Sequence, residues 1–255
     1  MLHILARVLR VTSVAPNVYV LAFHAPELGG AVKPGQFVNI LAGDGLQPLL
    51  RRPFSVYRID GDAVEVIFQR VGKGTAALSQ AQPGGLLDVI GPLGAGFHLD
   101  DPGYHTAILV GGGLGVAPLP LATAALRKAG KRMVTLLGAR TAGQLVEAHL
   151  ENVHVATDDG TRGLRGTVVD LAAQYIGARE IEGVRLFGCG PTPMLRALAA
   201  FARAHTLECE VSLEGQMACG IGLCQGCPVE LTGQVRTYAL MCKDGPVFNT
   251  RDIVI

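Results

Sequence analysis

Four cysteines near the end of the chain constrain its fold more than any other feature. They are Cys219, Cys224, Cys227 and Cys242, with the spacing C-x4-C-x2-C, then fourteen residues and the last cysteine. This spacing is typical of four thiolates that hold a [2Fe–2S] cluster. Glycines between them allow the loop to fold closely around a small inorganic core. The sequence therefore predicts an iron–sulfur centre that moves single electrons, with these four cysteines as its ligands.

Two other uses of the four cysteines stay open at this point. Structural zinc usually takes two paired C-x2-C knuckles, and the chain has one such pair. Two disulfides would suit an oxidising compartment, but the first residues alternate too quickly between apolar and charged for a signal peptide.

The most apolar run, 106–126, contains glycines and prolines that are typical of a strand, a loop and a helix start rather than a membrane span. We expect a soluble, cytoplasmic protein.

Length and charge set further limits. The chain has 255 residues, 49% of them hydrophobic, which is enough for about two compact units with buried cores. Its net charge of +1 gives no basic face for nucleic acid, and its 5% aromatic content, without tryptophan, offers few platforms for stacked bases. We therefore expect no nucleic-acid partner and no membrane partner.

Residues 1–99 are predicted to form a small antiparallel β-barrel. Six short runs of β-branched or alternating residues are separated by turn residues, which is typical of a closed barrel. The expected strands are 5–11, 18–23, 36–41, 54–59, 63–70 and 86–90, and a short helix is expected over 75–80.

Two motifs on this barrel suit phosphate groups. Arg52-Pro53-Phe54-Ser55 opens a strand with a guanidinium that can bind a phosphate through two hydrogen bonds. Gly72-Lys73-Gly74-Thr75 begins the short helix, where free amides and the helix dipole favour a pyrophosphate. Each motif alone fits an ordinary strand start or N-cap turn at least as well.

Residues 100–205 are predicted to form an α/β unit whose parallel sheet is covered on both faces. The expected strands are 107–110, 133–137, 153–157 and 184–187, and the expected helices are 119–128, 142–150, 168–176 and 193–205. The loop after the first strand has the pattern G-x-G-x-A-P, formed by Gly113, Gly115, Ala117 and Pro118, and its amides can face a pyrophosphate.

The third of these strands is followed directly by Asp158, Asp159 and Gly160. A carboxylate there can accept a hydrogen bond from a ribose hydroxyl and would repel a 2′-phosphate, which favours NAD over NADP. A solvated turn explains the same residues equally well.

The last segment, 206–255, is too short to build a core alone, so the metal site is expected to carry much of its stability. Short strands are expected over 228–231 and 235–238. The remaining Cys209 is expected to be a buried structural thiol.

In this order the motifs resemble those of the ferredoxin–NADP reductase superfamily. The barrel motif is similar to the superfamily's Arg-x-Tyr/Phe-Ser, the glycine loop to its G-x-G-x-A-P, and the run Cys189-Gly190-Pro191 to its Cys-Gly-Pro-x-x-Met. The segment SLEGQMACGIG, residues 212–222, resembles the electron-transfer subunits of class B dihydroorotate dehydrogenases. That family commonly has Glu-Arg where this chain has Gly215 and Gln216.

The resemblance implies a bound [2Fe–2S] cluster, FAD and NAD. It implies an FAD pyrophosphate held by Arg52 and capped by Gly74 and Thr75. The flavin ring would lie against Phe54 and Ser55, with Ser55 near the N5 atom that passes hydride. The other residues implied at the cofactors are Pro53 in the barrel motif, Ile67, Phe68, Gln69 and Arg70 along the adenine half, and Cys189, Gly190 and Pro191 near the nicotinamide.

The resemblance also implies a function. Electrons from a separate FMN-containing dihydroorotate dehydrogenase catalytic subunit would pass through the cluster and FAD to NAD+ in pyrimidine biosynthesis, within a heterotetramer of two copies of each subunit. A related reductase subunit that serves a hydrogenase, a sulfide dehydrogenase or a ferredoxin would share these motifs. A zinc-stapled binding module without redox activity is the alternative from another class.

Overall fold

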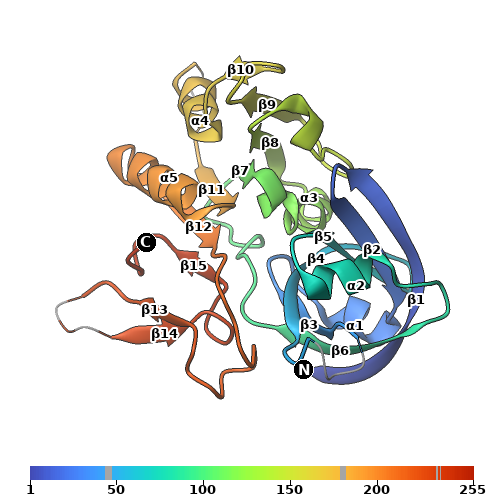
Figure 1. The fold of residues 1–255 in the computed structure, drawn as a ribbon. Helices are drawn as coiled ribbons and strands as arrows, with labels where there is room; N and C mark the ends of the chain where they lie inside the picture. The colour runs from blue at the N-terminus through green and yellow to red at the C-terminus, as the bar shows by residue number, and fades with distance from the viewer. Residues whose placement is uncertain (44–47, 179–181, 234, 236) are drawn as a thin grey trace.

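A computed structural model describes residues 1–43, 48–178, 182–233, 235 and 237–255 of the chain. Figure 1 shows its three parts: a β-barrel formed by the first residues, an α/β unit above it, and a C-terminal segment that lies beside the barrel. This arrangement confirms the predicted fold class of an antiparallel barrel, a parallel-sheet unit and a small C-terminal unit.

The barrel is closed by six antiparallel strands in the order β1-β2-β5-β4-β3-β6. They are β1 Leu2–Ala15, β2 Val18–His24, β3 Phe37–Leu41, β4 Arg52–Asp60, β5 Ala63–Gln69 and β6 Leu86–Leu93. All six predicted strands are thereby confirmed, and the predicted short helix is α2, Lys73–Ser79. A further helix that was not predicted, α1 Pro26–Ala31, connects β2 to β3.

Strands β2 and β5 are buried on both faces. Leu21 and Val66 lie in the barrel core, while Val20 and Ile67 point outward and pack against the α/β unit. A strand with two buried faces has a nearly continuous apolar sequence instead of a strict alternation. The barrel and the α/β unit are therefore joined by a shared apolar core.

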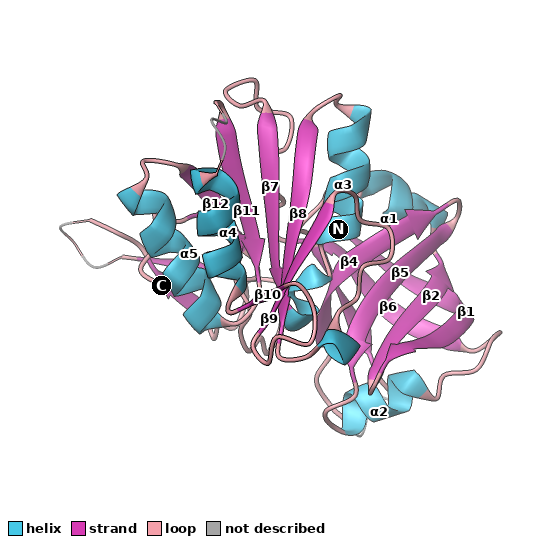
Figure 2. Cartoon of the chain, turned by 90° about the horizontal axis from the view of Figure 1, so that it is seen from above, coloured by secondary structure: helices cyan, strands magenta, loops and turns pink. Residues whose placement is uncertain are grey.

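The α/β unit contains a sheet in the order β10-β9-β8-β7-β11-β12-β15. Its strands are β7 Thr106–Gly112, β8 Arg132–Ala139, β9 Val153–Thr157, β10 Leu164–Arg165, β11 Val184–Cys189, β12 Glu208–Ser212 and β15 Val247–Asn249. All neighbouring pairs are parallel except β12 and β15. Helix α3, Leu119–Lys128, and the barrel cover one face, whereas α4, Val168–Gly177, and α5, Thr192–Ala204, cover the other (Figure 2).

The helix predicted over 142–150 is wrong. Only one 3-10 turn, η2 Ala142–Gln144, forms there. His149 adopts a left-handed φ of 65°, and the main-chain carbonyl of Ala148 accepts a hydrogen bond from Tyr57 of β4 at 3.3 Å. Val146 is buried in the core shared with the barrel. Contacts with the barrel thus override the helical pattern of this segment.

The C-terminal segment contributes to two sheets. β13, Pro228–Glu230, pairs with β14, Tyr238–Leu240, which begins three residues later than the second strand predicted there. β12 and β15 were not predicted, and they extend the large sheet. We therefore propose that the cluster unit begins after Ser212, later than the sequence-based boundary at 206, while the boundary near residue 99 stays as predicted.

The longest helices are far shorter than a bilayer crossing requires. Within the described part of the chain, no helix is long and apolar enough to span a membrane.

Candidate functional site

The four cysteines predicted as ligands lie on two turns that face each other. Cys219 and Cys224 belong to an irregular loop, and Cys227 directly precedes β13. Cys242 follows β14, so the pairing of β13 with β14 brings it back toward Cys227. Cys227 and Cys242 are buried, Cys219 is half-buried and Cys224 is exposed. The predicted ligands are thus brought together, with one side of the group toward the protein and one side toward solvent.

Main-chain amides point at three of the sulfur atoms. The Gly222 amide donates to Cys242 Sγ at 3.2 Å, and the Cys224 amide donates to Cys219 Sγ at 3.4 Å. The Gly226 amide donates to Cys224 Sγ, also at 3.4 Å. Such N–H···S contacts stabilise thiolates and tune the potential of an iron–sulfur cluster. The donor set therefore fits a [2Fe–2S] group.

The environments of the thiols differ across this group. Desolvation raises the pKa of Cys242, and the neighbouring Cys227 thiol raises it further. Desolvation also acts on Cys219, but amides of Cys224 and Ile221 outweigh it and lower the pKa of Cys219 to about 6. Because metal ligands must be thiolates, the buried Cys242 has to release a proton when iron is loaded.

The other two uses of the cysteines can be compared with this geometry. All six cysteines are free thiols, so the disulfide interpretation is wrong for this structure. Within the described residues, no three His, Cys, Asp or Glu side chains converge as they would around one metal ion. The four ligands of a two-iron cluster are divided between two metal atoms and need no such single point.

The cluster segment packs on the outside of the barrel. Cys227 and Cys242 share an apolar group with Phe37 of β3 and Leu93 of β6, and Ile221 is among the half-buried residues packed against it. Figure 1 shows the orange and red segment beside the barrel end that carries β3 and β6. The buried side of the ligand group therefore faces the barrel.

The barrel motif meets the start of α2 as the two phosphate-binding signals require. The Arg52 guanidinium donates to the carbonyl of Leu50 at 2.7 Å, which holds the side chain near α2. A Cβ atom on Gly74 would lie 3.2 Å from Arg52 Nε, so glycine allows this approach. Thr75 Oγ1 accepts hydrogen bonds from the amides of Val71 and Gly72 and caps the helix. A guanidinium beside a helix start fits a pyrophosphate.

The faces of β4 separate the residues of the barrel motif. Phe54 lies in the barrel core, with its ring 5.5 Å from that of Phe68. Pro53 and Ser55 are half-buried and belong to the opposite, outward face, since side chains alternate along a strand. The two residues expected at the flavin ring therefore point to different sides, and Ser55 is the one outside the barrel.

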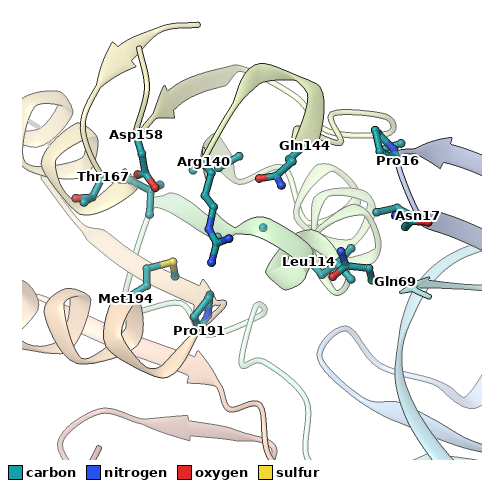
Figure 3. A pocket seen from close by; sticks show the side chains of 17 residues that line it. Pro16, Asn17, Gln69, Leu114, Arg140, Gln144, Asp158, Thr167, Pro191 and Met194 are labelled. Carbon is teal, nitrogen blue, oxygen red and sulfur yellow. The ribbon is translucent and has the colours of Figure 1, made fainter. Parts of the chain in front are cut away.

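A cavity of about 590 Å³ lies between the barrel and the carboxyl ends of the parallel strands. Figure 3 shows residues from both units around it. Among the described residues that line it, Arg140 is the one cation and Asp158 the one anion. The Arg140 guanidinium points into the cavity toward Pro191 (Figure 3). This is the place where ligands bind in α/β sheets of this kind.

The cavity contains only some of the predicted residues. Gln69, Gly113, Asp158 and Pro191 line it. Of the other residues expected along the adenine half, Ile67 packs against the α/β unit, Phe68 lies in the barrel core and Arg70 is exposed. The lining residues that the sequence analysis missed are Ala15, Pro16, Asn17, Val18, Gly112, Leu114, Gly138, Ala139, Arg140, Gln144, Thr167, Val168 and Met194. Arg140 follows β8 directly, and its place after a parallel strand was a usable signal.

The remaining predicted residues shape the glycine loop behind the cavity. A Cβ atom on Gly115 would overlap the Cys189 carbonyl, so glycine is required where the loop crosses the end of β11. Gly190 has a φ of 156°, and a Cβ atom there would lie 2.9 Å from Met194 Sδ and 3.1 Å from the Gly112 amide nitrogen. Ala117 and Pro118 connect the loop to α3. These residues act through main-chain packing.

Cys189 lies below the cavity surface, with 3% of its surface exposed. Desolvation raises the pKa of its thiol far above the ordinary value, although a hydrogen bond with Ser212 opposes the shift. The side chain is therefore a neutral thiol under physiological conditions. It can fill space beside a bound nicotinamide but cannot serve as a base.

Comparison with known proteins identifies the family of this chain. The iron–sulfur cluster binding domain family of dihydroorotate dehydrogenase B matches residues 214–254. Over 249 residues the chain is 41% identical to the dihydroorotate dehydrogenase B (NAD(+)) electron transfer subunit of Bacillus caldolyticus, covering 95% of each protein. It belongs to the family of dihydroorotate dehydrogenase B electron transfer subunits. A more distant member, from Desulforamulus reducens, is 37% identical over 98% of this chain and 97% of its own length.

Solved structures place this electron transfer subunit in a wider fold group. The NADH-dependent reduced ferredoxin–NADP oxidoreductase superimposes with a TM-score of 0.86 at 30% identity, covering 98% of this chain and 90% of that chain. Phthalate dioxygenase reductase, at 15% identity and a TM-score of 0.63, covers 94% of this chain and 77% of that chain and shares the fold. The family and the fold confirm the resemblance stated from the sequence and leave the zinc-stapled module without support.

Proposed function

We propose that this chain is the electron transfer subunit of a dihydroorotate dehydrogenase B and passes electrons from an FMN-containing catalytic subunit to NAD+ in pyrimidine biosynthesis. Its bound groups are a [2Fe–2S] cluster, FAD and NAD. When bound, FAD exchanges single electrons with the cluster and hydride with nicotinamide. The observation that carries the proposal is 41% identity to a subunit with this name over 95% of both proteins.

The chain's own residues hold and separate these groups. Cys219, Cys224, Cys227 and Cys242 hold the cluster, with amides of the loop donating to their sulfur atoms. Arg52 and the start of α2 would hold the FAD pyrophosphate, and Ser55, on the outward side of β4, would lie toward the flavin ring. The cavity with Gly113, Arg140 and Asp158 holds NAD. Cys189 is buried, and the described lining residues include no paired acid and base. We infer that the protein acts by positioning its cofactors relative to one another.

The partner is an FMN-containing dihydroorotate dehydrogenase catalytic subunit, and we propose a heterotetramer with two copies of each chain. The names of the relatives, which describe an electron transfer subunit of dihydroorotate dehydrogenase B, support the partner. The ferredoxin-linked oxidoreductase at 30% identity is the specific rival, and the identities of 37% to 41% over nearly the whole length favour dihydroorotate dehydrogenase.

Reconstitution tests the function directly. The purified chain, loaded with its cofactors, is mixed with a dihydroorotate dehydrogenase catalytic subunit, and the mass of the complex is measured by light scattering. We expect a complex with two copies of each chain and reduction of NAD+ by dihydroorotate only when both chains are present. NAD(H) exchange with a ferredoxin or a hydrogenase, but not with dihydroorotate, would contradict the proposal.

A further inference from the structure

Strand β3 carries a buried amide that none of the sequence motifs includes. Asn39 is 2% exposed and lies between Val38 and Ile40, whose side chains fill the barrel core. Its own side chain therefore belongs to the outward face of the strand. Asn39 Oδ1 is buried and has no hydrogen-bond partner among the described residues. A buried amide with one unmatched atom lowers stability unless its other contact compensates.

That other contact is with the cluster loop. Asn39 Nδ2 donates to the carbonyl of Cys219 at 3.1 Å, across 180 residues of sequence. Because a carbonyl can only accept, this contact fixes which end of the amide faces the loop. The acceptor belongs to the main chain of a proposed cluster ligand. The barrel thus holds the ligand's backbone directly.

The next residue of the loop, Gly220, packs so closely against Asn39 that a side chain would not fit between them. Gly220 has φ of 67°, in the left-handed region, and a Cβ atom there would overlap Asn39 Nδ2. A residue with a side chain would push the loop away from the strand and strain the backbone. Asn39 and Gly220 therefore fit together as a close contact between the barrel and the loop.

The pairing of β3 with β4 places this contact next to the barrel motif, Arg52-Pro53-Phe54-Ser55. Asn39 is opposite Pro53, and Phe37 is opposite Ser55, in the antiparallel pair of β3 and β4. Residues opposite each other on neighbouring strands have their side chains on the same face. Phe37 packs with Cys227 and Cys242. The outward face of β3 therefore contacts the cluster unit on one side and is adjacent to Pro53 and Ser55 on the other.

We propose that Asn39 is a positioning residue. It fixes the Cys219 end of the cluster loop one strand away from the barrel motif on β4. The inference rests on the proposed function, because it concerns the distance between two of its redox groups. The side chain of Asn39 donates to the main-chain carbonyl of Cys219. It acts through the backbone of Cys219, and its effect is on electron transfer between cluster and flavin rather than on hydride exchange with NAD.

The Asn39→Leu variant tests this role, since leucine keeps the size of the side chain and removes the donor. In the cofactor-loaded protein, mixed rapidly with NADH, we expect flavin reduction at the wild-type rate. Cluster reduction is expected to be slower by about five- to tenfold, the factor that corresponds to loss of one hydrogen bond that holds the loop in place. The electron paramagnetic resonance spectrum of the dithionite-reduced cluster is expected to broaden, and residues 219–222 to exchange deuterium faster.

Gln36→Leu is the matched control. Gln36 Nε2 also donates to a main-chain carbonyl, that of Gly94, at 2.6 Å, but this hydrogen bond lies within the barrel. The control is expected to lose some stability while the resonance spectrum and the rate of cluster reduction stay unchanged. The inference would be overturned if Asn39→Leu kept the wild-type resonance spectrum, the wild-type deuterium exchange over 219–222 and the wild-type rate of cluster reduction.

A second variant covers the case in which Asn39→Leu does not fold. Gly220→Ala leaves the barrel sequence intact and moves the loop away from Asn39. It is expected to slow cluster reduction in the same manner, and normal cluster reduction in this variant would also overturn the inference. A wild-type protein in which NADH reduces the flavin but never the cluster would instead contradict the proposed function.

Discussion

Arg52 is the residue that we propose to bind the pyrophosphate of FAD. Its guanidinium is held by the Leu50 carbonyl beside the start of α2, where a pyrophosphate would accept charge-assisted hydrogen bonds. Such bonds contribute about 1.5–3 kcal/mol each. We therefore predict that Arg52→Ala lowers affinity for FAD by at least about tenfold, while iron content stays unchanged. Absorbance of the purified variant measures both, and unchanged flavin content would exclude Arg52 from this role.

Asp158 is the residue that we propose to set the choice between NAD and NADP. Its carboxylate is the one anion among the described residues that line the cavity, and it would repel a 2′-phosphate. We predict that kcat/KM for NADH exceeds that for NADPH by about tenfold or more, since this corresponds to about 1.4 kcal/mol of repulsion. Asp158→Ser should reduce the difference by raising the value for NADPH. A wild-type preference for NADPH would contradict this role.

Arg140 is expected to act on NAD and NADP alike, because its side chain points into the interior of the cavity (Figure 3). Its guanidinium is the one cation among the described lining residues, so it can bind the phosphates that both dinucleotides carry. Arg140→Gln is predicted to raise KM for NADH about tenfold with little change in kcat, because it removes binding that is equal in ground and transition states. Arg127→Gln, which removes a surface ion pair with Glu151, is the control and should leave KM unchanged.

Sequence reasoning found residues whose signal is local and missed those that depend on distant contacts. The spacing of Cys219, Cys224 and Cys227 is contained in nine residues and required no knowledge of the fold. Asn39 carries no local signal, because its partner is 180 residues away. Phe54 was expected at the flavin, but the alternation of β4 turns its ring into the barrel core. Only the register of the strand could decide that.

At the level of elements, the periodic strands were predictable and the connecting segments were less so. The helix expected over 142–150 is absent because Tyr57 and the shared core hold that segment in an extended path. β12 and β15 were missed since each is short and is stabilised by pairing in a sheet that begins over 100 residues earlier. Long-range pairing of this kind leaves little trace in a local pattern.

The cluster unit is expected to depend on its metal more than the other elements do. Apart from the four cysteines it has a two-stranded sheet and a small apolar group against the barrel. A hairpin of this size is barely stable alone, and metal binding then supplies folding free energy. We predict that chelation of iron increases deuterium uptake over 217–242.

The same experiment contains its own control. β12 and β15 belong to the large sheet, so Glu208–Ser212 and Val247–Asn249 should keep their protection after chelation. Unchanged uptake over 217–242 would show that the unit is stable without metal. If β12 also took up deuterium faster after chelation, the cluster unit would unfold together with the large sheet and would not be a separate unit.

In the whole molecule, the cluster unit has an inner side and an outer side. Cys227 and Cys242 are buried toward the barrel with Phe37 and Leu93, whereas Cys224 is exposed, next to Leu223 with 77% of its surface exposed. The barrel motif on β4 is adjacent to the inner side. A partner that supplies electrons therefore has access to the outer side, and the cavity that we propose for NAD lies between the barrel and the α/β unit.

This arrangement predicts that the two half-reactions can be separated by one substitution. In the reconstituted complex, Cys224→Ser should lose the reduction of NAD+ by dihydroorotate. Serine is a poor ligand for iron, so the cluster that would connect the partner with the barrel is impaired. NADH oxidation with an artificial acceptor that reacts at the flavin should continue, since Arg52 and the cavity are untouched. Cys209→Ser, at a buried thiol of β12 outside the ligand set, should retain both activities. Dihydroorotate-dependent reduction of NAD+ at the wild-type rate in Cys224→Ser would mean that electrons enter the barrel without passing the four cysteines.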